Sequence, residues 1–160
     1  MPYLVDGYNL QKRIQKTDPQ FETLSDTYLC KILSRYLKRI REQGQIIFDG
    51  IGPPDKTGFE NLDNIEVVFV GRNTDADTVI ERKIKANTAP KKLVVVSSDR
   101  RLRVAAAKRK AVGIKSEDFW PMVTRELGRR SKRRAEPRSK HDGLTESETD
   151  QWCDFFGLKE

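Results

Sequence analysis

The sequence predicts an α/β fold in which helices cover both faces of a mainly parallel β-sheet. Residues 65–70, apart from Glu66, and residues 93–96 are apolar runs rich in β-branched residues without alternation, a pattern typical of strands that are buried on both faces. Between such runs, apolar residues recur at intervals of three and four, as in an amphipathic helix. A length of 160 residues with 36% hydrophobic residues suits one compact core with a polar remainder.

The first part of the chain is expected to hold three strands and one helix. Short apolar runs that end in turn residues predict strands, at residues 3–5, 46–48 and 65–70. After the first strand, Ser25 or Asp26 is expected to cap a helix whose apolar residues recur every three or four positions and which ends at Gly44. Glycines and prolines in residues 50–58 predict a mobile loop.

The chain then continues to alternate between helix and strand. Residues 74–87 carry apolar side chains on one face and are expected to form a crossover helix. An alanine-rich helix is expected after Asp99, followed by an edge strand at residues 112–114 and a helix that begins near Ser116. We therefore expect one domain that extends to about residue 128.

The remainder of the chain has a different composition. Basic residues crowd a stretch that lacks apolar periodicity, so residues 129–143 are expected to form a flexible basic arm. A capping-box pattern precedes Trp152 and further aromatic residues, which predicts a short amphipathic helix within residues 144–160. The expected organisation is a domain at residues 1–128, an arm and a terminal helix.

Composition and charge exclude some classes of protein. No run approaches the roughly 18 apolar residues of a membrane span, and polar residues come too early for a signal peptide, so we expect a cytoplasmic protein without a membrane partner. Cys30 and Cys153 lack C-x-x-C spacing, which gives no support to a zinc site or a disulfide. Lysine and arginine total 31 against 24 aspartates and glutamates, a formal net charge of +7, as expected for a protein that binds a polyanion.

Carboxylates follow several of the predicted strands. Asp6, Asp49 and Asp99 each come after one, and the carboxyl ends of parallel strands meet at one edge of a sheet, where ligands bind. Asp77 and Glu81 begin the helix after the third strand, on one helical face near that edge. Close carboxylates repel one another and need a cation or protons. The sequence predicts a site for Mg²⁺ or Mn²⁺.

Four motifs stand in order at the ends of the expected elements: V-D-G-Y-N at 5–9, F-D-G at 48–50, A-D-T-V-I-E at 76–81 and S-S-D at 97–99. Together they resemble the YacP-like NYN domain, a branch of the PIN-like ribonucleases, over residues 1–128. The resemblance implies a PIN-like Rossmannoid three-layer sandwich and metal-dependent RNA endonuclease activity, which some members direct at mRNA on ribosomes. By position, Asp6, Asp77 and Asp99 match the metal-site acids, and Asn9 matches the polar residue after the first strand.

The sequence and the resemblance together predict a metal-dependent endoribonuclease. Asp49 and Glu81 are further candidate metal ligands, and Asn9 is expected to orient a water or a phosphate. A water activated by a metal and attacking in line leaves 5′-phosphate and 3′-hydroxyl ends. RNA is expected to contact basic residues near the site and in the arm, namely Arg100, Arg101, Arg129, Arg130, Lys132, Arg133 and Arg134. The arm and the tail lie outside the resemblance.

Each site residue also has a structural explanation. Asp6 followed by glycine is ordinary turn chemistry, and Asp99 is a suitable cap for the helix after it. Asp77 suits the positive end of a helix dipole. Glu81 is expected to pair with Lys85 one helical turn later. Only a shared sheet edge makes these acids a site.

Other functions remain open from the sequence alone. The main alternative is a non-catalytic RNA- or ribosome-binding protein in which the acidic edge is vestigial. A phosphoacceptor domain is disfavoured because Ser97, Ser98 and Asp99 lack the lysine expected at that strand end, and a dinucleotide-binding enzyme because no G-x-G-x-x-G follows a strand. The RNA target, the number of metal ions and the oligomeric state are not predicted.

Overall fold

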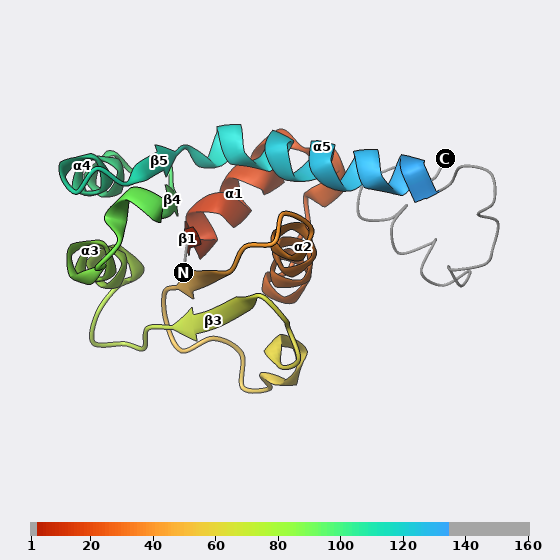
Figure 1. Cartoon of the computed structure of the whole chain (residues 1–160). Helices are drawn as coiled ribbons and strands as arrows, with labels where there is room; N and C mark the ends of the chain where they lie inside the picture. Colours follow the sequence, from red (N-terminus) through yellow and green to blue (C-terminus); the bar gives the residue numbers. More distant parts are fainter. Residues whose placement is uncertain (1–2, 135–160) are drawn as a thin grey trace.

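The computed structural model of the chain describes residues 3–134, with side chains to residue 129. Within this range, five strands and five α-helices alternate along most of the chain (Figure 1). The strands are β1 (Tyr3–Asp6), β2 (Gly44–Phe48), β3 (Ile65–Phe69), β4 (Val94–Val96) and β5 (Val112–Ile114). The helices are α1 (Gly7–Thr17), α2 (Asp26–Arg39), α3 (Ala76–Ala86), α4 (Arg100–Lys108) and α5 (Ser116–Arg134). The connections contain short 3-10 helices, η1 (Pro19–Phe21), η2 (Thr57–Phe59) and η3 (Pro90–Lys92).

The strands form one parallel sheet with β1 at its centre. Their order is β3-β2-β1-β4-β5, and Val5 of β1 lies opposite Ile46 of β2 on one side and Val96 of β4 on the other. The chain builds outward from β1 to β3 and then returns to add β4 and β5 on the other side. Parallel α/β sheets bind ligands where this direction changes, at the carboxyl ends of the strands. Here that point lies between β1 and β4.

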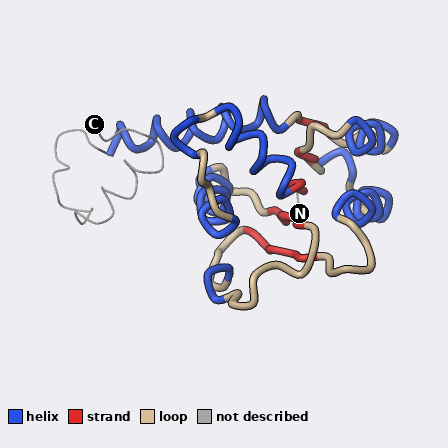
Figure 2. Tube along the Cα trace, turned by 180° about the vertical axis from the view of Figure 1, so that it is seen from behind, coloured by secondary structure: helices blue, strands red, loops and turns tan. Residues whose placement is uncertain are grey.

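Helices cover both faces of the sheet (Figure 2). The core between the sheet and helices α1, α2 and α5 includes Val5 and Phe119, whereas the core on the α3 and α4 side includes Leu4 and Ile47. Adjacent strand residues such as Leu4 and Val5 point to opposite faces, as strand geometry requires. The predicted α/β three-layer sandwich with a parallel sheet is confirmed.

Helix α2 begins as predicted but ends earlier. The Ser25 side chain accepts a hydrogen bond of 3.1 Å from the backbone N–H of Tyr28, so it is the N-cap. The helix ends at Arg39, not at Gly44, and Gly44 is the first residue of β2. A Cβ atom at Gly44 would lie 2.9 Å from the Cβ atom of Tyr3. The glycine therefore permits close approach of β1 and β2 and does not terminate the helix.

Helix α1 was not predicted, because Asp6 and Gly7 were interpreted as a turn after the first strand. The strand instead leads directly into the helix. Gly7 is required for close packing, since a Cβ atom there would lie 2.5 Å from the ring of Phe48. In α1, Leu10 and Ile14 are fully buried, and this short apolar stripe was too weak a signal beside the Asp-Gly pair.

Helix α5 extends beyond the predicted end of the domain. It continues to Arg134, so residues 129–134 are helical where the flexible arm was expected to begin, and the domain boundary at residue 128 stays a prediction. The rest of the predicted basic arm and the predicted terminal helix fall in residues 135–160, outside the described residues. No helix within residues 3–134 is long and apolar enough to cross a membrane.

Candidate active site

Asp6 ends β1 at the point where the sheet changes direction, and its side chain is buried. Its Oδ2 atom accepts a hydrogen bond of 2.9 Å from the Ser97 hydroxyl. The pKa of Asp6 is raised to about 6, first by burial and then by the charges of Asp77, Asp49 and Asp99, whereas the hydrogen bond from Ser97 opposes the shift. The acids predicted to share this edge therefore lie close enough to affect one another.

Ser97 connects two of these acids. Its hydroxyl donates to Asp6 and accepts a hydrogen bond of 3.0 Å from the backbone N–H of Asp99, and the residue is fully buried. The hydroxyl thus fixes the end of β1 against the turn after β4. Ser97 belongs to one of the four sequence motifs, but the sequence analysis assigns no function to it. Its place between a buried strand and a candidate site acid is the feature that could have indicated one.

Asp77 lies close to Asp99. It stands in the first turn of α3, where burial and then the neighbouring carboxyl group of Asp99 raise its pKa to about 6. Asp99 also caps α4, because its Oδ1 atom accepts from the backbone N–H of Arg101 at 2.9 Å. Asp99 therefore caps α4 and at the same time lies beside Asp77.

Asp49 and Glu81 are both engaged with other parts of the fold. Oδ1 of Asp49 accepts a hydrogen bond of 2.7 Å from the backbone N–H of Ala76, which ties the end of β2 to the start of α3. Oε1 of Glu81 accepts from Nη2 of Arg101 at 2.7 Å and from its Nε at 3.1 Å. The expected pairing with Lys85 is therefore wrong: Lys85 contributes only a longer-range charge, and the ion pair joins α3 to α4.

Asn9 binds two segments that are distant in sequence. Its Oδ1 atom accepts hydrogen bonds from the backbone N–H of Ser98 at 2.9 Å and from the hydroxyl of Ser116 at 2.6 Å. Asn9 thereby holds the turn after β4 against the start of α5. Since its oxygen has these partners, a function toward water or phosphate would fall to its Nδ2 group.

A second polar cluster, which the sequence did not predict, lies beside Asn9. The Ser98 hydroxyl donates to Glu117 in the first turn of α5 and accepts from the backbone N–H of Ser116 at 3.1 Å. Nε of Arg13, in α1, lies 3.6 Å from Oε1 of Glu117. These contacts depend on how α1 and α5 pack, so no local pattern in the sequence predicts them.

The predicted RNA-binding residues occupy two separate regions. Arg100 and Arg101 begin α4 next to Asp99, and Arg100 is exposed. Arg129 is exposed near the other end of α5, and its Nη2 atom lies 3.7 Å from Oε1 of Glu126. The side chains of the four remaining residues are outside the described part, but their backbone belongs to the last turns of α5: Arg130, Lys132, Arg133 and Arg134. At 1.5 Å per residue, Arg129 lies about 20 Å along α5 from Ser116 and the site.

The sequence model of the YacP-like NYN domain matches residues 3–155. The chain belongs to the YacP-like NYN domain family. The domain of this family is generally of the nuclease type. The match extends well beyond residue 128, so the basic segment and most of the tail belong to the family pattern, contrary to expectation.

Solved structures of similar fold include two crystal structures of Rae1 (YacP) from Bacillus subtilis. One of them is 22% identical to this chain, covers 83% of this chain and 79% of its own, and has a TM-score of 0.66. The other, of the W164L mutant, is 19% identical, covers 98% of this chain and 92% of its own, and has a TM-score of 0.67. These structures support the NYN fold. A search of curated proteins gave no significant match.

The donor atoms of this NYN domain suit a hard divalent cation, although they are not preassembled as a metal site. No three histidine, cysteine, aspartate or glutamate side chains within the described range are arranged to hold a metal ion. However, Asp6, Asp77 and Asp99 offer carboxylate oxygens, the ligands that Mg²⁺ prefers. The pKa values of Asp6 and Asp77 are raised first by burial and in addition by neighbouring acids, and a bound cation would offset the charge of those acids.

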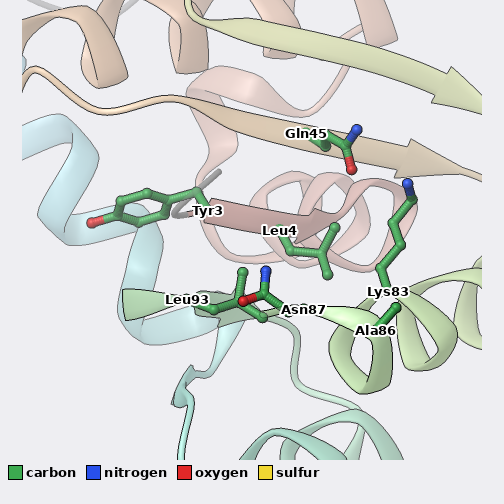
Figure 3. Close-up of a pocket in the computed structure, with 7 residues that line it drawn as sticks. All are labelled: Tyr3, Leu4, Gln45, Lys83, Ala86, Asn87 and Leu93. Atoms are coloured by element: carbon green, nitrogen blue, oxygen red, sulfur yellow. The ribbon is translucent and has the colours of Figure 1, made fainter. Parts of the chain in front are cut away.

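A cavity of about 200 Å³ lies elsewhere in the NYN domain (Figure 3). Tyr3, Gln45 and Leu93 line it at or next to the amino ends of β1, β2 and β4, and Lys83 and Asn87 line it from α3 and its end. The cavity is therefore at the opposite edge of the sheet from Asp6. No acidic residue lines it, so it does not belong to the candidate active site.

Proposed function

We propose that this chain is a metal-dependent endoribonuclease that hydrolyses RNA phosphodiester bonds. The observation that carries the proposal is the meeting of three acids at one sheet edge. Asp6 comes from β1, Asp77 from α3 and Asp99 from the turn after β4, and their closeness contributes to the raised pKa values of Asp6 and Asp77. Membership of a nuclease-type family supports the same function.

In this proposal, Asp6, Asp77 and Asp99 are the residues that hold Mg²⁺ or Mn²⁺. Such an ion makes a bound water more acidic and offsets negative charge at the phosphate. Ser97 keeps the buried Asp6 carboxylate in place, and Asp77, whose pKa is raised to about 6, must be ionised to act as a ligand. Asn9 orients a water or a phosphate oxygen through Nδ2. The attack does not need the RNA 2′-hydroxyl, so the products carry 5′-phosphate and 3′-hydroxyl ends.

RNA is the proposed substrate class, and mRNA bound to ribosomes is the more specific substrate that the family resemblance favours. The net charge of +7 supports binding to a polyanion. The basic end of α5 lies about 20 Å or more from Ser116, so it would contact RNA or a ribosome away from the bond that is cleaved.

Incubation of structured and ribosome-bound RNAs with Mg²⁺ or Mn²⁺ tests this function. Wild-type protein is expected to cleave, and Asp77→Asn is expected to bind the same RNA without cleaving it. Mapping of the product ends checks the predicted chemistry. Cleavage that persists in Asp77→Asn or in excess EDTA would contradict the proposal.

The second candidate function is a non-catalytic RNA- or ribosome-binding protein. It is favoured by the lack of a preassembled metal site among residues 3–129 and by the structural partners of Asp49 and Glu81. The same incubation separates the two functions, because this candidate requires RNA binding without metal-dependent cleavage.

A further inference from the structure

An ion pair between α3 and α4 holds an arginine beside the acidic edge. Two nitrogens of Arg101 donate to Oε1 of Glu81, at 2.7 Å and 3.1 Å. The Arg101 side chain remains 48% exposed, whereas that of Glu81 is 26% exposed. The carboxylate thus fixes the orientation of the guanidinium while leaving it open to solvent. Arginine is well suited to this arrangement because its planar group keeps donors for a second partner.

The guanidinium also lies close to the site acids. The charge of Arg101 lowers the pKa of Asp77, against the larger effects of burial and Asp99. It likewise lowers the pKa of Asp75, the N-cap of α3. Arg101 therefore places a fixed positive charge at the border of a group of acids, where a phosphate approaching those acids would meet it.

Further cations gather around the same carboxylate. The charges of Lys85 and Lys108 also lower the pKa of Glu81, and both lysines are exposed. Arg101 and Lys108 are seven residues apart, which is two helical turns or about 10 Å along one face of α4. The adjoining outer surfaces of α3 and α4 thus carry positive charge that begins at the site and extends away from it.

We propose that Arg101, positioned by Glu81, binds an RNA phosphate next to the bond that is cleaved, and that Lys85 and Lys108 contact the RNA backbone beyond it. This inference rests on the proposed ribonuclease function. It gives Glu81 a positioning function in place of the candidate metal-ligand function expected from the sequence. The surface formed by these residues recognises phosphates and not bases, so it contributes affinity without sequence preference.

Binding of a single-stranded RNA oligonucleotide in EDTA, followed by fluorescence anisotropy over a range of salt, tests the RNA contact without cleavage. Arg101→Gln is expected to weaken binding about tenfold and to reduce the slope of log affinity against log salt by about 0.7. Lys85→Gln and Lys108→Gln are each expected to reduce that slope as well. Arg101→Lys keeps the charge and is expected to restore much of the slope.

The Lys38–Asp63 pair provides matched controls. It is an exposed ion pair of 3.2 Å that involves α2, on the other face of the sheet. Lys38→Gln removes one positive charge and Asp63→Asn removes one acid partner, as the test variants do. Both are expected to leave RNA affinity, salt slope and cleavage unchanged. Equal reductions of affinity in Arg101→Gln and Lys38→Gln would overturn the inference.

Glu81→Gln tests positioning. It is expected to leave Mn²⁺ affinity in calorimetry unchanged and to lower kcat about tenfold, while KM stays level or falls because a negative charge near RNA is removed. Weaker Mn²⁺ binding would make Glu81 a metal ligand and overturn its positioning function, as would an unchanged kcat. If wild-type protein does not cleave RNA, the proposed function fails, and the binding series in EDTA separately decides the RNA contact of Arg101.

Discussion

The fully buried hydroxyl of Ser97 donates a hydrogen bond of 2.9 Å to the Asp6 carboxylate. It joins the end of the first strand to the turn that carries Asp99, across 91 positions of sequence. Because this bond stabilises the ionised form of a buried carboxyl group, it lowers the pKa of Asp6. Ser97 therefore influences both the stability of the fold and the charge of the candidate site.

Ser97→Ala is expected to reduce the free energy of unfolding by about 1–3 kcal/mol, since a buried carboxylate loses a hydrogen-bond donor. The pKa of Asp6 should rise further, so the acidic limb of the pH–rate profile should move to higher pH. Ser97→Thr keeps the hydroxyl and serves as the control. Denaturant unfolding and pH–rate profiles provide the measurements, and an unshifted limb in Ser97→Ala would contradict this function of Ser97.

The raised pKa values of Asp6 and Asp77 predict how the metal-free protein responds to pH. Both values are about 6 in the folded protein, above the ordinary 3.8 of an unfolded chain. The folded state therefore binds more protons in this interval, and these two groups reduce stability as the pH rises from about 4 to about 6. This loss of stability is complete once the pH exceeds the folded-state pKa of about 6.

Asp6→Asn is accordingly expected to stabilise the protein at pH 7 in EDTA. The gain should be about 1–3 kcal/mol, because one unit of pKa shift corresponds to about 1.4 kcal/mol. It should shrink as the pH falls and disappear near pH 3, where the carboxyl group is mostly protonated in both the folded and the unfolded state. Urea unfolding at the two pH values measures this difference, and a variant that is less stable than wild type at pH 7 would refute the predicted cost.

Addition of Mn²⁺ is expected to raise the melting temperature at pH 7.5. A ligand that binds only the folded state at about one hundred times its Kd stabilises it by about 2.7 kcal/mol. The rise should shrink below pH 6, as protons compete for the carboxylates, and it should be small in Asp77→Asn. Thermal melts with Mn²⁺, with EDTA and with K⁺ as a monovalent control measure the effect. An equal rise in Asp77→Asn would assign the ion to another position.

Neutralising the basic end of α5 is expected to weaken RNA binding without changing kcat. The change converts Arg129, Arg130, Lys132, Arg133 and Arg134 to glutamine. Each side chain that binds a phosphate of single-stranded RNA should, when it is neutralised, reduce the salt slope by about 0.7. Because the last turns of α5 are about 20 Å or more from Ser116, the chemical step should be unaffected. A lower kcat at saturating RNA would show that this segment acts at the site.

The strands and the acidic edge were predictable because their signals are local. Apolar runs marked β3 and β4, Asp6 is the last residue of β1, and Asp99 follows the end of β4 by three residues. The contacts of the site were not predictable in the same way. Glu81 has Lys85 at the ideal helical spacing, yet it pairs with Arg101 of the neighbouring helix. Only the packing of α3 on α4 makes that partner available.

Helix α1 and the polar contacts of Asn9 show the same limit of prediction from local sequence. Between Gly7 and Thr17, Leu10 and Ile14 provide a short apolar stripe, so a strand-end turn was the simpler interpretation. The partners of Asn9 lie 89 and 107 positions away. No periodicity within a window of sequence can encode contacts at that separation, and they appear only when the sheet is assembled.

The central position of β1 determines when during synthesis the site can be completed. β1 is made first, but its neighbours β2 and β4 begin about 40 and 90 residues later. A nascent chain that stops before Ser97 has the Asp6 carboxylate but neither its hydrogen-bond donor nor Asp99. Non-local strand pairing of this kind forms slowly. The acids of the candidate site can consequently come together only after β4 and the turn that carries Asp99 have been made.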